Sequence, residues 1–296
     1  MRILAIGDPH GILPTHINKI IKDNDIELVL CPGDFPAAPS SKYLWKYADQ
    51  LKRNKDGLVG EESLVHILGQ KKVDALVQQS VDSWKEMRKK IEAISVPVVI
   101  VYGNTSEAVT VPWFKDIGDF VYDISMEDWV AKTSDLYQLE YSTEKFGDYN
   151  VTGFGVKFTS SVKKVSKKDK VPMPAWRKKA RIKHEKMLPK ILSKDPRKTI
   201  MLVHEPPRGV LDSIVIKGNP RYGDHVGDEL LRAAIDSYQP LVVVCGHIHE
   251  HLGSKKVGKT TVVNAGAKGD YAIIDIQGET VKVKTVASGK NKLMKL

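Results

Sequence analysis

Residues that can bind metal ions follow five short apolar stretches of this 296-residue chain. They supply carboxylate, amide and imidazole groups, and together they are Asp8, His10, Asp34, Asn104, His204, His247 and His249. This mixture favours an ion such as Mn, Fe, Zn or Ni over Mg or Ca, which prefer shells made of oxygen. Seven ligands exceed the needs of one tetrahedral ion, whereas two ions that share a carboxylate use them all. The residues therefore predict a centre of two divalent metal ions.

The apolar stretches in front of these ligands have the composition of buried strands. They are rich in Val, Ile and Leu without alternation, as strands covered on both faces are. The stretches are Arg2–Gly7, Glu27–Cys31, Pro97–Tyr102, Thr199–Val203 and Leu241–Cys245. Because functional groups collect at the carboxyl ends of strands in an open α/β sheet, we expect the ligands to meet in one crevice. The i, i+2 spacing of Asp8 and His10, and of His247 and His249, predicts that each pair shares one side of an extended backbone.

Helical patterns separate the strands, and later strands follow them. The expected helices are Pro14–Lys22, Val73–Ile94 with apolar residues every three or four positions, and Asp224–Ser237 with Asp224 as its N-cap. Alternation with period two predicts strands at Thr260–Asn264, Tyr271–Ile276 and Thr280–Val286. We therefore expect a layered α/β sandwich with mixed sheets flanked by helices, formed by a single domain over residues 1–296.

Two insertions interrupt this alternation. The first, residues 42–95, is expected to be helical. The second, residues 157–198, holds sixteen Lys or Arg residues against three acidic ones, although the whole chain carries a net charge of only +10. Its four prolines predict broken helix and loop. Such a segment can serve as a solvated cap over the site, or it can neutralise the phosphates of a nucleic acid.

The composition favours a globular protein, with 42% hydrophobic and 28% charged residues. No apolar run approaches the roughly 20 residues that a membrane-spanning helix needs. The apolar start of the chain is interrupted by Asp8, which leaves no room for the core of a signal peptide. Cys31 and Cys245 are the only cysteines, so a disulfide framework is excluded. We expect a cytoplasmic protein without a membrane partner.

The ligand motifs resemble those of the calcineurin-like metallophosphoesterases in type and order. The matching motifs are Asp8-Pro-His10, Gly33-Asp34, Gly103-Asn104, His204 with Pro206-Pro207, Gly246-His247-Ile-His249, and Asn264-Ala-Gly266. The resemblance covers the core but not the two insertions. It implies two divalent ions, with Mn favoured, and a bridging hydroxide that attacks a phosphate ester. It also implies that one ion is held by Asp8, His10, Asp34 and His249, and the other by Asp34, Asn104, His204 and His247.

One position departs from the family pattern. The family usually has a His directly after the Asn ligand, where it stabilises the phosphoryl group or protonates the leaving oxygen, but this chain has Thr105. General-acid help is worth roughly a hundredfold or more, so a monoester with a poor leaving group should react slowly. We therefore expect a phosphodiesterase whose substrate is a phosphate ester such as a nucleotide.

Two further residues are candidates for the reaction. His225 is a possible substitute acid, and the alternative is a structural residue at the entry of a helix. Arg208 is a candidate for binding the substrate phosphate together with Asn104, and the alternative is an ordinary solvated charge.

Two other functions stay open at this point. A nuclease would grip nucleic acid through residues 157–198. A catalytically weak interaction or scaffold protein would keep the fold without turnover, although such a protein does not need all seven ligands.

Overall fold

Two mixed sheets form the centre of the molecule. The computed structural model describes residues 1–47, 61–103, 126–155, 175–216 and 222–290. The first sheet contains β1 (Arg2–Ile6), β2 (Leu28–Cys31), β3 (Val98–Ile100), β4 (Leu136–Gln138), β11 (Tyr271–Gln277) and β12 (Thr280–Val286). The second contains β5 (Ser142–Phe146), β6 (Tyr149–Phe154), β7 (Thr199–Val203), β8 (Val242–Cys245), β9 (Gly253–Val257) and β10 (Thr260–Asn264).

Parallel strands occupy the middle of each sheet. The strand orders are β12-β11-β1-β2-β3-β4 and β5-β6-β7-β8-β10-β9. In the first sheet β1, β2, β3 and β4 pair parallel with one another, and in the second sheet β6, β7, β8 and β10 do so. The strands β11, β12, β5 and β9 pair antiparallel with their neighbours. All five stretches expected to precede a ligand lie among the parallel strands. Their carboxyl ends within each sheet therefore lie at one edge.

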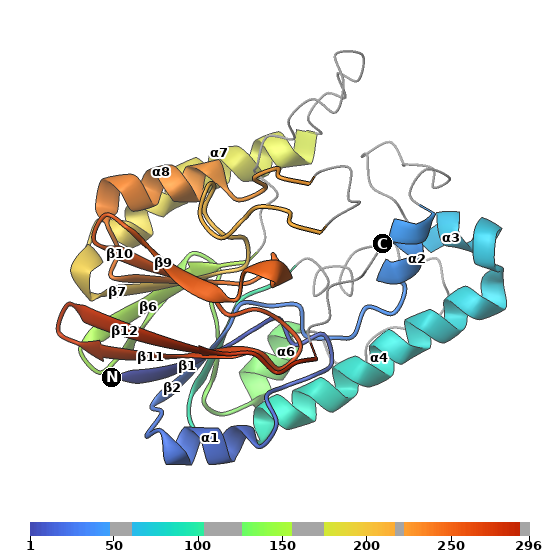
Figure 1. Ribbon diagram of the computed structural model, residues 1–296, viewed down its shortest axis with the longest axis horizontal. Helices are drawn as coiled ribbons and strands as arrows, with labels where there is room; N and C mark the ends of the chain where they lie inside the picture. Colours follow the sequence, from blue (N-terminus) through green and yellow to red (C-terminus); the bar gives the residue numbers. More distant parts are fainter. Residues whose placement is uncertain (48–60, 104–125, 156–174, 217–221, 291–296) are drawn as a thin grey trace.

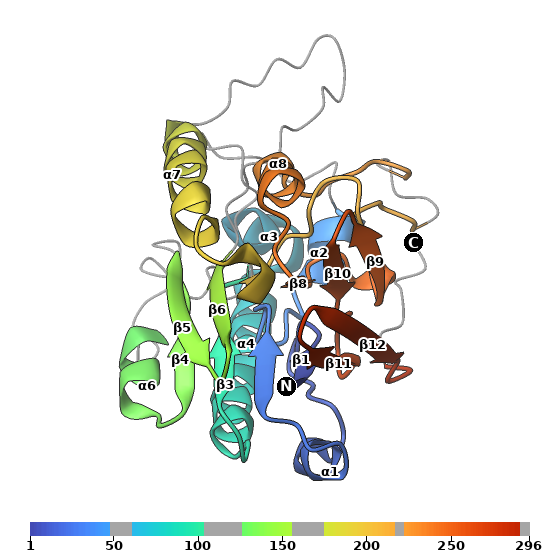
Figure 2. The same cartoon turned by 90° about the vertical axis from the view of Figure 1, so that its left-hand side faces the viewer.

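Helices cover the outer faces of both sheets. These are α1 (Ile17–Asp23), α4 (Gln70–Glu92), α6 (Met126–Lys132), α7 (Ala175–Leu192) and α8 (Glu229–Tyr238). Helices α2 (Ser41–Lys46) and α3 (Glu61–Leu68) lie beyond the sheets at one end of α4, and two short 3-10 helices are η2 (Pro196–Lys198) and η3 (His249–His251). Figure 1 shows α7 and α8 over the second sheet, with α1, α4 and α6 on the side of the first. The turned view in Figure 2 shows the strands between α8 and α1. This architecture confirms the expected layered α/β sandwich.

Alternate side chains of the inner strands enter different apolar cores. Ile3 and Ala5 of β1 face the core between the sheets, together with Val244 of β8. Leu4 of β1 packs on the other face, against Met87 of α4. Because both faces of these strands are buried, the sequence shows a continuous apolar run instead of alternation.

The helix starts differ in detail from the sequence expectations. Helix α8 begins at Glu229 with Asp228 as its N-cap, so the expectation of Asp224 as the cap was wrong. Asp228 accepts a hydrogen bond from Leu231 N, which satisfies one of the free amides of the first turn.

The described part of the basic segment contains α7. This helix continues through Pro189, which is exposed and leaves the buried side of the helix to Leu188 and Leu192. Pro196 begins η2, while residues 157–174 lie outside the described part of the chain. No described helix is both long and apolar enough to cross a membrane.

Candidate metal centre

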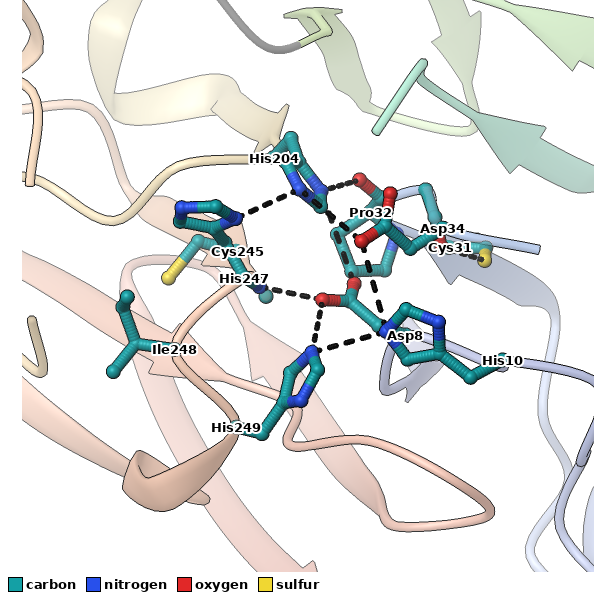
Figure 3. A network of polar contacts seen from close by, with 12 residues as sticks. Asp8, His10, Cys31, Pro32, Asp34, His204, Cys245, His247, Ile248 and His249 are labelled. Carbon is teal, nitrogen blue, oxygen red and sulfur yellow. Dashed lines mark hydrogen bonds and ion pairs between the residues drawn. The ribbon is translucent and has the colours of Figure 1, made fainter. Parts of the chain in front are cut away.

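Six of the seven candidate ligands converge where the two sheets meet. Asp8 and Asp34 follow β1 and β2 of the first sheet, whereas His204 follows β7 of the second. His247 and His249 follow β8, and Figure 3 shows these side chains pointing toward one another. Asn104 comes after β3 and Gly103, but it lies outside the described residues, as does Thr105.

Four of these residues form a tight cluster. Ligand atoms of Asp8, His10, Asp34 and His249 all lie within 4.8 Å of one another. His10 Nε2 is 3.2 Å from His249 Nε2, which in turn is 3.3 Å from Asp8 Oδ2. His10 Nε2 is also 3.6 Å from Asp34 Oδ2. This is the set that the family resemblance assigns to one ion.

A second group shares the Asp34 carboxylate. His204 Nε2 lies 3.8 Å from Asp34 Oδ2 and 3.2 Å from His247 Nδ1. The other ring nitrogen of His204, Nδ1, lies 2.8 Å from the carbonyl oxygen of Pro32. A carbonyl only accepts, so His204 Nδ1 donates and the lone pair of a neutral ring is on Nε2. Asp34 Oδ2 therefore lies between two groups of imidazoles.

The backbone at three candidate ligands is left-handed. The φ angles are 43° at His10, 51° at Asp34 and 65° at His247. The expectation that the i, i+2 pairs lie on an extended backbone was therefore wrong, although the side chains still converge. Backbone contacts hold this conformation: His10 N donates to the Asp34 carbonyl at 2.8 Å, and His247 N donates to Asp8 Oδ2 at 2.6 Å. Strain of this kind persists where the surroundings enforce it.

Two glycines allow the carboxylates to approach the chain closely. A Cβ atom at Gly103 would collide with Asp34 Oδ1, and one at Gly246 would collide with Asp8 Oδ1. Any larger residue at these positions therefore displaces a candidate ligand.

Asn264 braces the segment that carries His247 and His249. It is fully buried at the end of β10, and its Nδ2 donates to the carbonyls of Gly246 at 3.2 Å and Ile248 at 3.0 Å. Its Oδ1 accepts from Gly266 N at 2.9 Å. The amide side chain thus fixes the loop between the two histidines.

Burial keeps two of the imidazoles neutral. It lowers the pKa of His247 to about 3, with help from the neighbouring His204. Burial also lowers the pKa of His10, in spite of the nearby Asp34 carboxylate. A neutral imidazole offers the lone pair that a metal ion requires.

The carboxylates act on the other two imidazoles. Burial alone would lower the pKa of His204, but Asp34 and Asp8 outweigh it and raise that pKa. The pKa of His249 is raised in the same way, because its contact with Asp8 outweighs burial. The two buried carboxylates thus favour positive charge at this site, and a bound divalent cation would supply that charge.

The donor set fits metal ions for a second reason. Asp8 Oδ1 is buried and has no hydrogen-bond partner among the described residues. Two pairs of ring nitrogens, His10 with His249 and His204 with His247, approach to 3.2 Å. A metal ion between the paired ring nitrogens would be bound by their lone pairs, and it would also satisfy the buried oxygen of Asp8.

The other two candidates lie on the segment between β7 and α8. Arg208 Nη1 is 3.6 Å from Glu229 Oε1, so the guanidinium faces a carboxylate at the start of α8. His225 Nδ1 is 2.6 Å from Asp212 Oδ1. Sequence reasoning did not identify Asp212, because a single Asp in a loop gives no signal of its own.

The family model for metallophosphoesterases of the calcineurin superfamily matches residues 1–286. The chain belongs to this superfamily. A crystal structure that is 18% identical superposes on the metallophosphoesterase with a TM-score of 0.58, over 97% of this chain and 99% of the other, and so shows the same fold. The protein TT1561 of Thermus thermophilus is 16% identical, with a TM-score of 0.47 and coverages of 96% and 98%. An archaeal phosphodiesterase is 13% identical, with a TM-score of 0.40 and coverages of 97% and 100%. No curated protein matches the chain significantly.

Membership and site geometry agree on the general chemistry. This metallophosphoesterase is a hydrolase of a metal-dependent superfamily, and Asp8, His10, Asp34 and His249 are its candidate metal ligands.

Proposed function

We propose that the protein hydrolyses phosphodiesters at a centre of two divalent ions. The position of Asp34 Oδ2, 3.6 Å from His10 Nε2 and 3.8 Å from His204 Nε2, is the observation that carries this proposal. An oxygen in this place suits a bridging ligand between two ions. Asp34 would bridge them, with Asp8, His10 and His249 on one side and Asn104, His204 and His247 on the other.

The protein's own residues would orient these ligands. The carbonyl of Pro32 sets the tautomer of His204, and the backbone amide of His247 holds Asp8 Oδ2. Bound divalent ions would attract the phosphate, polarise its oxygens and activate water. A second layer of hydrogen bonds of this kind often changes metal affinity by about 10–100-fold.

The preference for diesters rests on Thr105. Where relatives usually have a His, Thr105 has no group that protonates a leaving oxygen at neutral pH. A nucleotide-like diester with a moderately good leaving group depends less on such help than an alkyl monoester does.

Purified protein stripped with a chelator and reloaded with Mn, Ni, Zn or Mg provides the test. We expect a higher kcat/KM for bis(4-nitrophenyl) phosphate than for 4-nitrophenyl phosphate, with Mn the best ion. Asp34→Asn and His247→Ala should remove both turnover and one or more bound ions, whereas His66→Asn, at an exposed position on α3, should change neither. A preference for the monoester refutes the diester assignment, and protein that binds no metal refutes the proposal as a whole.

A nuclease is the second candidate function, and a feature of α7 favours it. Lys179, Lys183, Lys186 and Lys190 are exposed at helical spacing, opposite the buried face that contains Leu188. Four lysines that neutralise four phosphates give a slope of about −3 for log K against log[salt] on single strands. Binding of single-stranded DNA and RNA, measured across a salt titration for wild type and Lys183→Glu/Lys186→Glu, tests this function. No binding at low salt excludes it.

A scaffold without catalysis is the third reading. Turnover of the diester by the wild type, abolished in His247→Ala, would exclude it.

A further inference from the structure

The segment that joins β7 to α8 forms a short antiparallel hairpin. Its two arms pair through a bridge between Ser213 and His225. Ile214 N donates to the Asp224 carbonyl at 2.9 Å, and Gly223 N donates to the Ile214 carbonyl at 2.8 Å. His225 therefore lies on a backbone with defined pairing.

The hairpin contacts η3, the short helix that begins at the candidate ligand His249. His251 Nε2 lies 2.8 Å from the Ser213 carbonyl oxygen and 2.9 Å from Ser213 Oγ. His251 belongs to η3, which begins at the candidate ligand His249. On its other side, the segment starts directly after His204, at the end of β7. The contact of Ser213 with His251 thus holds the hairpin to a residue two positions after the candidate ligand His249.

Asp212 is buried at the base of the hairpin and accepts three hydrogen bonds. Its Oδ2 accepts from Gly209 N at 3.0 Å and from Gly227 N at 2.9 Å, which ties the two arms together. Its Oδ1 lies 2.6 Å from His225 Nδ1. The side chain of Asp212 is 0% exposed, whereas that of His225 is 51% exposed. One buried carboxylate therefore fixes the orientation of a ring that faces solvent.

The contact with Asp212 uses Nδ1 of His225, so Nε2 is the nitrogen that a substrate can contact. An ionised carboxylate only accepts hydrogen bonds, so Nδ1 carries a hydrogen and donates a hydrogen bond to Asp212 Oδ1. When a second proton binds to this ring it binds at Nε2, which is the nitrogen that can give it to a neighbouring oxygen. Asp212 thus arranges His225 as a proton donor through Nε2.

We propose that Asp212 is a positioning residue that holds His225 to protonate the leaving oxygen of the phosphodiester. The inference rests on the proposed phosphodiesterase function. In the reaction, the oxygen of water forms a new bond to phosphorus, and the bond from phosphorus to the leaving oxygen breaks. The leaving oxygen keeps the electron pair and takes the proton from His225 Nε2. The proton lost by the attacking water returns to His225 through solvent, which restores the starting state.

A pair of substrates that differ only in the leaving group tests this role. Methyl 4-nitrophenyl phosphate releases a good leaving group, and methyl phenyl phosphate releases a poor one that needs protonation. For His225→Asn and Asp212→Asn we expect kcat to fall about a hundredfold on the phenyl ester but less than about tenfold on the nitrophenyl ester. Metal content should match the wild type, and His66→Asn, the matched control, should lower neither rate.

Nitrogen-15 NMR of the histidine rings provides a readout that does not depend on turnover. The wild type should show His225 protonated at Nδ1, and Asp212→Asn should shift that proton toward Nε2. Equal losses of kcat on both esters overturn the inference even if the wild type is an active diesterase. A wild type without diesterase activity refutes the proposed function, and the NMR result then shows by itself whether Asp212 orients the ring. A His225 ring protonated only at Nε2 in the wild type overturns the positioning role.

Discussion

Replacing Asn264 by alanine tests whether one buried amide holds the loop of His247 and His249. The substitution removes the three hydrogen bonds to Gly246, Ile248 and Gly266. A typical hydrogen bond contributes about 1 kcal/mol net, so the direct loss is about 3 kcal/mol. The backbone groups left without partners in a buried site add to this cost.

The expected change in melting temperature follows from this free energy. An unfolding entropy of about 2.1 cal/mol/K per residue amounts to about 0.6 kcal/mol/K for 296 residues, so a loss of about 3 kcal/mol in Asn264→Ala should lower Tm by about 5 °C. The measurement is a thermal unfolding scan of chelator-treated protein, which removes any contribution from bound metal. A parallel titration with Mn should show weaker binding, because the loop with two candidate ligands is no longer braced.

The matched control is Thr261→Val on the same strand. Thr261 Oγ1 is buried and has no hydrogen-bond partner among the described residues, so valine keeps the shape and removes an unsatisfied group. We expect Tm to stay the same or rise. A fall of less than about 2 °C for Asn264→Ala, or equal falls for both variants, would refute the reasoning about the amide.

Three other outcomes follow from the site. Gly246→Ala should displace Asp8 and so reduce both bound metal and activity. The control Gly253→Ala should leave both unchanged, because its new Cβ has no neighbour closer than 3.9 Å. Metal content measured by mass spectrometry checks this. Burial raises the pKa of Cys31 and Cys245, so a thiol reagent should label neither in the folded protein and both after denaturation, and fast labelling of the folded protein would contradict the structure. Dialysis against a chelator should abolish diester hydrolysis and added Mn should restore it, while activity that survives metal removal would argue against a metal centre.

Much of the fold could be predicted because the inner strands are buried on both faces. The runs before Asp8, Asp34 and His204 are short and rich in Val, Ile and Leu, and the structure places a parallel strand at each of them. Helix α4 could also be predicted, because its apolar residues lie along one face of the helix over its length. The edge strands β4, β5 and β9 were not anticipated, because short strands with partly exposed faces resemble loops in sequence. Strand β6, which lies between β5 and β7, was not anticipated either.

The convergence of the ligands could be predicted, but their local geometry could not. Strand ends brought the residues together, as parallel topology requires. The left-handed backbone at His10 and His247 depends on hydrogen bonds to residues far away in the sequence, and no local pattern encodes such bonds. The same holds for Asp212 and His225, which are close only because the hairpin brings its arms together.

The candidate ligands come from both sheets, and this has a consequence for unfolding. His10 and His249, whose ring nitrogens lie 3.2 Å apart, are separated by 239 positions in the chain. An ion held by both would act as a reversible cross-link that closes a very long loop of the unfolded chain. A free ion concentration one hundred times its Kd would add about 2.7 kcal/mol to the free energy of unfolding. Loss of metal should therefore lower the stability of the whole fold as well as abolish activity at the site. The melting temperature would then measure metal occupancy without any substrate.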